Sequence, residues 1–155
     1  MAKVNVYLNF EGNCEQAFNF YRSVFGGEFK TFMRFKDLPM PGMTMDEHEQ
    51  NMLMHVALPV GKEDILMGSD TPKTVKVSPG NNVRISLTPE TMDEAERLFE
   101  ALSAGGKVGM PLAKQVWGDF YGDFEDKFGI FWMVDYAYPK PETGAELMSA
   151  AKATK

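Results

Sequence analysis

Cysteine is nearly absent from this chain of 155 residues, with Cys14 as the single example. One cysteine cannot form an internal disulfide, and it rules out a cysteine-rich zinc site. Cys14 also lies on the apolar stripe of an expected helix, where a thiol packs as a small apolar side chain. We therefore expect a buried, inert cysteine; the alternative is a thiol whose pKa is lowered by its place in the first helical turn.

Positive charge is also scarce, because 16 Lys and Arg stand against 22 Asp and Glu, for a net charge of -6. Without a basic stripe to neutralise phosphates, nucleic acid and anionic membranes are excluded as partners. The sequence also lacks a run of about 20 apolar residues, and its first residues do not form a basic segment followed by an apolar one. We expect a cytosolic location.

Several catalytic and cofactor motifs are missing as well. The sequence contains no G-x-S-x-G, no P-loop, no H-E-x-x-H, and no strand followed by G-x-G-x-x-G. Each of these would place a nucleophile, a phosphate or a metal at a defined turn or helix. We expect no cofactor and no methyltransferase-type glycine loop. What remains is an ordinary globular composition, with 44% hydrophobic residues, for one domain or two packed halves.

The first half of the chain predicts a strand, a helix and three more strands. Residues 3–10 alternate between apolar and polar, as in a half-buried strand. Asn13, with Gln16 three residues later, fits a helix N-cap, and Gly26 and Gly27 end the apolar helical stripe. Further strands are expected at 28–35, 52–60 and 63–68.

Residues 36–51 predict a long loop, which is a common place for lids and partner contacts. Met40, Met43 and Met45 are flexible apolar side chains that would either adapt to a ligand or fill gaps at a surface or dimer contact. His48 lies between two glutamates and is expected to be solvated.

The same order of elements then repeats. Residues 82–87 predict a strand, Thr91 with Glu94 opens a second helix, and Gly105 and Gly106 close it. A strand candidate at 107–116 and an aromatic hairpin at 117–135 follow. An internal repeat of this kind is the main organisational signal in the sequence.

This repeat divides the chain into modules. We place the first module at 1–70, a connection at 71–80, the second module at 81–138 and a tail at 139–155. The tail carries a helical candidate at 143–152, which would be a terminal helix, a dimer contact or a frayed end.

The hairpin at 117–135 combines aromatic residues, acids and glycines, then ends in an apolar run at 130–134. We expect Gly122 and Gly129 to supply the freedom that the turn needs. The charged residues Asp123, Glu125, Asp126 and Lys127 are expected to keep the tip of the turn in water.

Two segments resemble a known family. The strings YLNFEGNCEQAFNFYRSVFGG at 7–27 and WGDFYGDFEDKFGIFWMV at 117–134 are similar to the PhnB-like branch of the vicinal oxygen chelate superfamily. That superfamily includes glyoxalase I, extradiol dioxygenases and the bleomycin and fosfomycin resistance proteins. The resemblance implies an α+β fold of two βαβββ modules, with curled mixed sheets around a cavity and helices outside. It also implies a homodimer, with modules that pair within one chain or swap between chains.

The resemblance also indicates where a metal would bind. In metal-dependent members, a histidine on the first strand and a glutamate on the last strand of each module hold a divalent ion. The matching positions are Asn5 and Asn82 for histidine, and Met67 and Met133, within one residue, for glutamate. Amides and thioethers are poor ligands for such ions. We expect no metal at this place.

Side chains that alternate away from the helices are expected to face the cavity. The ligand-binding candidates are Asn5, Tyr7, His55, Asn82, Arg84, Trp117, Tyr121 and Trp132.

Several of these candidates have a second interpretation. The Arg84 guanidinium suits a ligand carboxylate or phosphate, or forms an internal ion pair, for instance with Asp70 or Asp135. The aromatic candidates are pocket walls or core, and for Trp132 the core is favoured. His55, inside a strand, is more often a wall or core residue than a metal ligand.

Three functions are compatible with this pattern. The leading hypothesis is a homodimer that binds a small, partly apolar molecule without a metal. The second is an enzyme that uses a relocated metal at His55, or an acid–base pair such as His55 and Tyr121. The third is a structural or interaction module whose own side chains fill the cavity.

Overall fold

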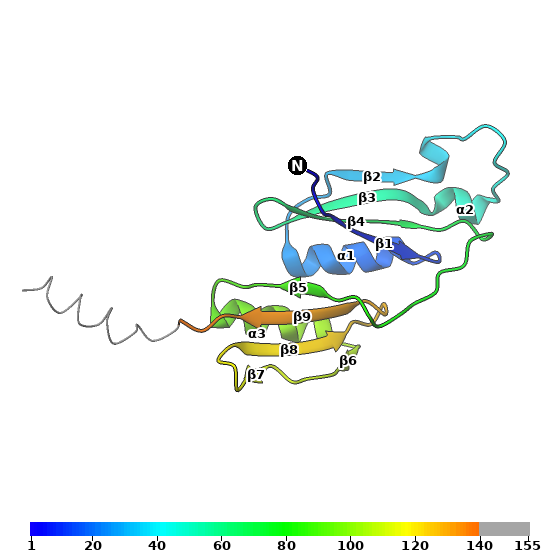
Figure 1. Ribbon diagram of the computed structural model, residues 1–155. Helices are drawn as coiled ribbons and strands as arrows, with labels where there is room; N and C mark the ends of the chain where they lie inside the picture. Colours follow the sequence, from blue (N-terminus) through cyan, green and yellow to red (C-terminus); the bar gives the residue numbers. More distant parts are fainter. Residues whose placement is uncertain (140–155) are drawn as a thin grey trace, which may run out of the picture.

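A computed structural model describes residues 1–139 and arranges them in two mixed sheets, drawn one above the other in Figure 1. The upper sheet has the strand order β1-β4-β3-β2, with β1 parallel to β4 and the other pairs antiparallel. Its module comprises β1 (Val6–Phe10), α1 (Cys14–Phe25), β2 (Thr31–Arg34), η1 (Phe35–Asp37), α2 (Glu47–Asn51), β3 (Leu53–Val60) and β4 (Asp64–Asp70).

The lower sheet has the order β5-β9-β8-β6, and β7 also pairs with β8. Here β5 is parallel to β9, as β1 is to β4 in the first sheet. Its module comprises β5 (Ile85–Leu87), α3 (Met92–Ser103), β6 (Lys107–Val108), β7 (Ala113–Lys114), β8 (Phe120–Glu125) and β9 (Phe131–Tyr136). The predicted α+β fold with two βαβββ-type modules is thus confirmed.

Some expectations about the fold stay open or need local correction. Curling of the sheets around a common cavity stays a prediction, and the helical candidate at 143–152 lies outside the described residues. The expected loop at 36–51 contains α2, which begins after a reciprocal cap between Asp46 and Glu49. The expected strand at 107–116 is broken into β6 and β7. No helix among residues 1–139 is long and apolar enough to cross a membrane.

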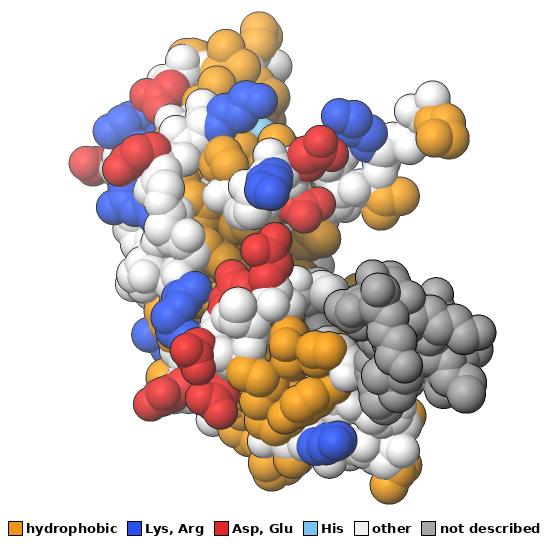
Figure 2. Space-filling model, turned by 90° about the vertical axis from the view of Figure 1, so that its left-hand side faces the viewer, with side chains coloured by type: hydrophobic (Ala, Val, Ile, Leu, Met, Phe, Trp, Pro, Cys, Tyr) orange, Lys and Arg blue, Asp and Glu red, His pale blue; other side chains and the backbone are white. Residues whose placement is uncertain are grey.

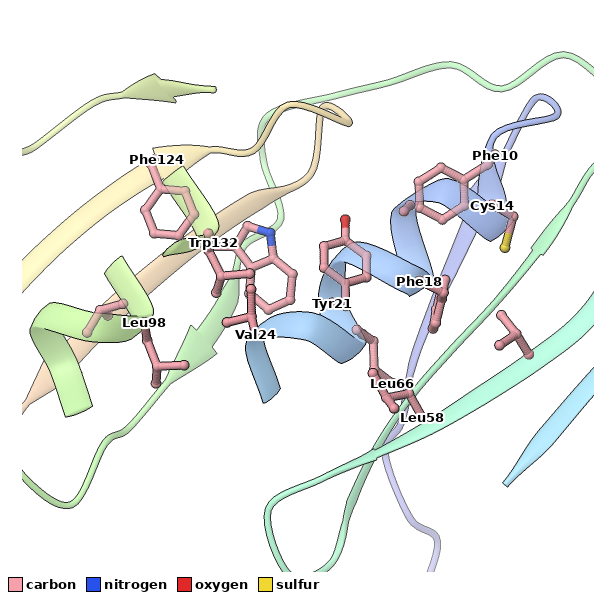
Figure 3. Close-up of a cluster of buried hydrophobic side chains, with 14 of the residues drawn as sticks. Phe10, Cys14, Phe18, Tyr21, Val24, Leu58, Leu66, Leu98, Phe124 and Trp132 are labelled. Carbon is pink, nitrogen blue, oxygen red and sulfur yellow. The ribbon is translucent and has the colours of Figure 1, made fainter. Parts of the chain in front are cut away.

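A single apolar core joins the two modules. The stripe of α1 packs on the upper sheet, and the same helix also contacts α3. Figure 3 shows Tyr21 of α1 beside Trp132 of β9, with Leu98 of α3 and Phe124 of β8 in the same cluster. The Tyr21 and Trp132 rings meet edge to face, with centroids 5.5 Å apart. Burial of these aromatic rings therefore holds the modules together.

The first helix is capped by a residue from a distant strand. We expected Asn13 to cap α1, but its side chain makes no capping hydrogen bond. Instead, Asp70 at the end of β4 accepts hydrogen bonds from the backbone N–H groups of Gly12 (2.9 Å) and Cys14 (3.0 Å). Its second oxygen accepts from the Leu53 N–H at 2.9 Å. A carboxylate at this helix start offsets the unpaired amides and the positive end of the dipole.

A second buried carboxylate, Asp126, joins the modules at the turn between β8 and β9. It is 2% exposed, so the expectation that it keeps the hairpin tip in water is wrong. The Tyr21 hydroxyl donates to it at 2.6 Å, and the Trp132 indole N–H donates at 2.9 Å. The backbone N–H groups of Phe128 and Ile130 donate to its other oxygen. Four donors explain why this charge is tolerated inside the protein.

Gly122 also has a different role from the expected one. It lies inside β8, whereas Gly129, with a φ of 84°, occupies the turn. A Cβ built on Gly122 would lie 2.6 Å from the Phe99 ring and 2.8 Å from Leu112 Cα. Gly122 therefore permits the close approach of α3 and the chain before β7 to this strand.

Candidate functional site

Tyr7 and His55 form an interacting pair on the upper sheet. Tyr7 is on β1 and His55 is on β3, on the face turned away from α1, as strand alternation predicts for Tyr7. Their rings are stacked, with centroids 5.7 Å apart and planes 15° apart. The Tyr7 hydroxyl lies 3.2 Å from His55 Nδ1. With the hydroxyl as donor, Nδ1 is the unprotonated ring nitrogen, and Nε2 carries the proton.

A second chain of contacts crosses the lower sheet, and it begins at Arg84. Arg84 Nη1 lies 3.4 Å from Asp123 Oδ2, and the Tyr121 hydroxyl donates to the same oxygen at 2.8 Å. The Trp117 and Tyr121 rings meet at 65°, with centroids 5.8 Å apart. Burial and the nearby Asp123 carboxylate both raise the pKa of Tyr121. Tyr121 therefore acts as a hydrogen-bond donor at neutral pH.

Arg84 has a different partner from the two that we named. Asp70 is occupied at the start of α1, and Asp123 forms the ion pair with Arg84. Asp123 is only 6% exposed, so the expectation that it lies in water at the hairpin tip is wrong. Strand alternation places it on the same face as Tyr121, and its other oxygen accepts the Met110 N–H at 3.0 Å.

A cleft of about 720 Å³ lies between the modules. It brings Asn5 and Tyr7 from the first module together with Arg84 from the second. Its walls are mainly apolar and include Val4, Val6, Leu8, Val77, Val83, Ile85, Phe128, Ile130 and Phe131. A few polar groups over an apolar wall are typical of small-molecule sites, and the volume falls in the usual range.

The other candidates lie elsewhere. Trp132 is 1% exposed in the core and forms the inner wall of a smaller hollow of about 210 Å³. Asn82 is exposed, ahead of β5. His55 and Tyr121 have different partners on different sheets, so the structure does not form the acid–base pair that we named. Met40, Met43 and Met45 line a separate surface hollow of about 380 Å³.

The positions that correspond to the family's metal ligands do not fit a divalent ion. Met67 lies opposite Tyr7 in the first sheet, and Met133 lies opposite Ser86 and Asp123 in the second. Asn5 precedes β1. Two amides and two thioethers do not supply the imidazole and carboxylate donors that such an ion requires. Within residues 1–139, no cluster of three or more His, Cys, Asp or Glu side chains could hold one either.

Asp123 and Asp135 were missed as site residues. Asp123 lies two residues after Tyr121 on β8, and Asp135 lies two residues after Met133 on β9. Since every second side chain of a strand points to the same face, the sequence could have placed both acids on the outer face. The high content of acids and glycines in this segment concealed that signal, because such residues are typical of turns.

The two-module fold, with polar contacts on the outer face of each sheet, defines a class of protein. A model of the Glyoxalase/Bleomycin resistance protein/Dioxygenase superfamily matches residues 3–134, and the chain belongs to that superfamily.

Within that superfamily, the chain is similar to several individual proteins. YjdN of Escherichia coli is 28% identical over 142 residues, which cover 87% of this chain and 95% of YjdN. The crystal structure of PA1353 from Pseudomonas aeruginosa matches with a TM-score of 0.78 and 36% identity, covering 88% of this chain and 98% of PA1353. A PhnB protein from Bacillus cereus, described as a putative 3-demethylubiquinone-9 3-methyltransferase, matches with a TM-score of 0.68 and 27% identity, covering 88% and 100%. The chain is therefore PhnB-like.

Proposed function

We propose that this protein binds a small, partly apolar molecule in the cleft between its modules, without the metal of its superfamily. The observation that carries the proposal is the cleft itself, about 720 Å³ with apolar walls and the polar groups of Asn5, Tyr7 and Arg84. The apolar walls favour binding by burial, and the polar groups orient the molecule.

A ligand screen tests this proposal. Protein purified without an affinity tag and treated with chelator is melted in the presence of a chemical library. We expect at least one compound to raise the melting temperature equally with and without chelator, because ligand binding to the folded state stabilises it. Stabilisation that disappears with chelator would point to metal-assisted binding and contradict the proposal.

Two matched variants assign binding to the cleft. Val83 lines it and is 75% exposed, so Val83→Trp fills part of the space and is expected to abolish the stabilisation. Val108 is 49% exposed on β6, outside the residues that line the cleft, and Val108→Trp is expected to retain it. If no compound stabilises the wild-type protein, the binding proposal fails and a structural or interaction module is favoured.

We further propose a homodimer. Within the described residues, β1 and β5 are edge strands of their sheets, because each pairs with a single neighbouring strand. Val4, Val83, Val116 and Trp117 are exposed apolar side chains, and Figure 2 shows hydrophobic side chains at the surface of the lower, second module. Open edges and exposed apolar residues favour self-association. Sedimentation equilibrium at several concentrations tests it, and a monomer at all of them would refute it.

A second candidate function is acid–base catalysis by Tyr7 and His55. The observation that favours it is the 3.2 Å contact between the Tyr7 hydroxyl and His55 Nδ1, which orients the two rings and allows a proton to pass between them. A compound that stabilises the wild-type protein is incubated with wild type, His55→Gln and Tyr7→Phe, and the products are followed by mass spectrometry. Conversion by wild type but not by His55→Gln supports catalysis, and recovery of unchanged compound from wild type refutes it for that compound.

The methyltransferase description of the Bacillus cereus protein is not carried over to this chain. That activity requires a site for a methyl-donating cofactor, and the sequence offers no glycine-rich loop of the kind that holds nucleotides.

A further inference from the structure

An exposed aromatic corner lies at the start of β8. The Trp117 side chain is 56% exposed, whereas the other tryptophan, Trp132, is 1% exposed in the core. The Trp117 and Tyr121 rings are in contact at 65°, with centroids 5.8 Å apart. An exposed tryptophan held against a second ring offers a large rigid surface to a ligand and loses little side-chain entropy on binding.

An unpaired carboxylate lies beside this corner. Asp135 on β9 is directly opposite Tyr121 in the antiparallel pair, so both side chains lie on the same sheet face, with Cβ atoms about 5 Å apart. Asp135 Oδ1 is buried and accepts no hydrogen bond from residues 1–139. Within those residues it is the one buried side-chain oxygen or nitrogen without a partner. A buried acceptor without a donor is costly, so a positive charge close to this carboxylate is stabilising.

The charge around Asp135 favours a cation over a neutral donor. Burial and the nearby Asp119 carboxylate both raise the pKa of Asp135, since each of them disfavours its negative charge. Arg84 does not compensate that charge, because its ion pair is with Asp123. Lys114 lies with its ammonium 5.0 Å from the centre of the Tyr138 ring. It pairs with Phe120, so it faces the opposite side of the sheet from Tyr121.

We propose that Trp117, Tyr121 and Asp135 form a binding site for a protonated organic amine that carries an apolar group. The ammonium pairs with the Asp135 carboxylate, whose side chain is half-buried beside the two rings. The apolar part and the remaining charge rest on the Trp117 and Tyr121 rings, because aromatic faces attract cations. Alcohols lack the charge, and carboxylates are repelled by Asp119 and Asp135.

Calorimetric titration with three matched compounds tests the site. Phenethylamine, phenethyl alcohol and phenylacetate share one apolar group and differ in charge at neutral pH. We expect phenethylamine to bind at least about tenfold more tightly than the alcohol, and phenylacetate not to bind. Equal binding of the amine and the alcohol, or no saturable binding of the amine, would overturn the proposal.

Two variants locate the amine, and one serves as a control. Asp135→Asn keeps the shape and removes the charge, and we expect it to weaken amine binding at least about tenfold. Trp117→Ala removes the larger ring and is expected to weaken it as well. Asp93→Asn, an exposed acid on α3, is expected to leave binding unchanged. Unchanged binding in Asp135→Asn, with an unaltered circular dichroism spectrum, would refute the assignment.

The amine site and the cleft are tested separately. Trp117 and Asp135 are not among the residues that line the cleft. We therefore expect Val83→Trp to abolish stabilisation by cleft ligands and to leave the affinity for phenethylamine unchanged. Loss of both in that variant would show that the amine binds in the cleft, and it would overturn the separate site.

Discussion

Replacement of Asp126 by alanine is expected to lower the free energy of unfolding by about 4 kcal/mol. The substitution removes the acceptor of the Tyr21 hydroxyl and of the Trp132 indole N–H. Both donors belong to side chains that are at most 1% exposed, so water does not replace the carboxylate. A buried donor without a partner costs about 1–3 kcal/mol, and two of them give the expected value. The remaining donors, the backbone N–H groups at the turn, reach water more easily.

The assay is equilibrium unfolding in urea, followed by tryptophan fluorescence. Because total stability is about 5–15 kcal/mol, a loss of this size shifts the transition strongly without necessarily abolishing the fold. Tyr21→Phe removes one donor to a charged acceptor and is expected to cost about 1.5–3 kcal/mol. Glu100→Ala, an exposed position on α3, is the control and is expected to change stability by less than about 0.5 kcal/mol.

The two substitutions are also expected to be strongly non-additive. Once Tyr21 has lost its hydroxyl, Asp126→Ala leaves only the indole N–H without a buried partner. The double variant should therefore lose less stability than the sum of the two single losses. A loss below about 1 kcal/mol in Asp126→Ala would refute the view that this carboxylate joins the modules.

Three further expectations concern packing, pH and reactivity. Gly122→Ala should lower stability by about 1–3 kcal/mol in thermal melts, because its Cβ would lie 2.6 Å from the Phe99 ring, and an unchanged melt would contradict that contact. The raised pKa of Asp135 means that the folded state holds its proton more tightly than the unfolded state. Stability from this group is thus complete below the unfolded pKa of about 4 and is lost as pH rises through the folded pKa. The stability of Asp135→Asn relative to wild type should therefore increase as pH rises above about 4. Burial raises the pKa of the Cys14 thiol, so iodoacetamide should label it only in denaturant, and rapid labelling of the folded protein would contradict its burial.

The repeated order of elements was predictable because it depends on local periodicity. The apolar stripe of α1 and the alternation in β1 are properties of consecutive residues. The bounds were less predictable, since Val4 has the apolar character of the strand but is 99% exposed ahead of β1. Where a strand begins depends on the length of its partner, and that is not a local property.

Within the candidate site, the placement of Tyr7 on the outer face was predictable from alternation, but its contact with His55 was not. The two residues are 48 positions apart and meet only because β4 lies between their strands. The partner of Arg84 was missed for the same reason, since Asp123 faces it across β9.

The sequence by itself determined the class of this protein: two modules with the same order of elements, amides and thioethers at the positions of the metal ligands, and a string of residues typical of PhnB-like proteins. Only the tertiary structure decided which acids are buried. Asp70, Asp123 and Asp126 resemble any turn acid in the sequence, yet in the folded chain each is paired with groups that are distant in the sequence. The cost of burying a charge depends on donors that folding brings together, and one-dimensional patterns do not contain them.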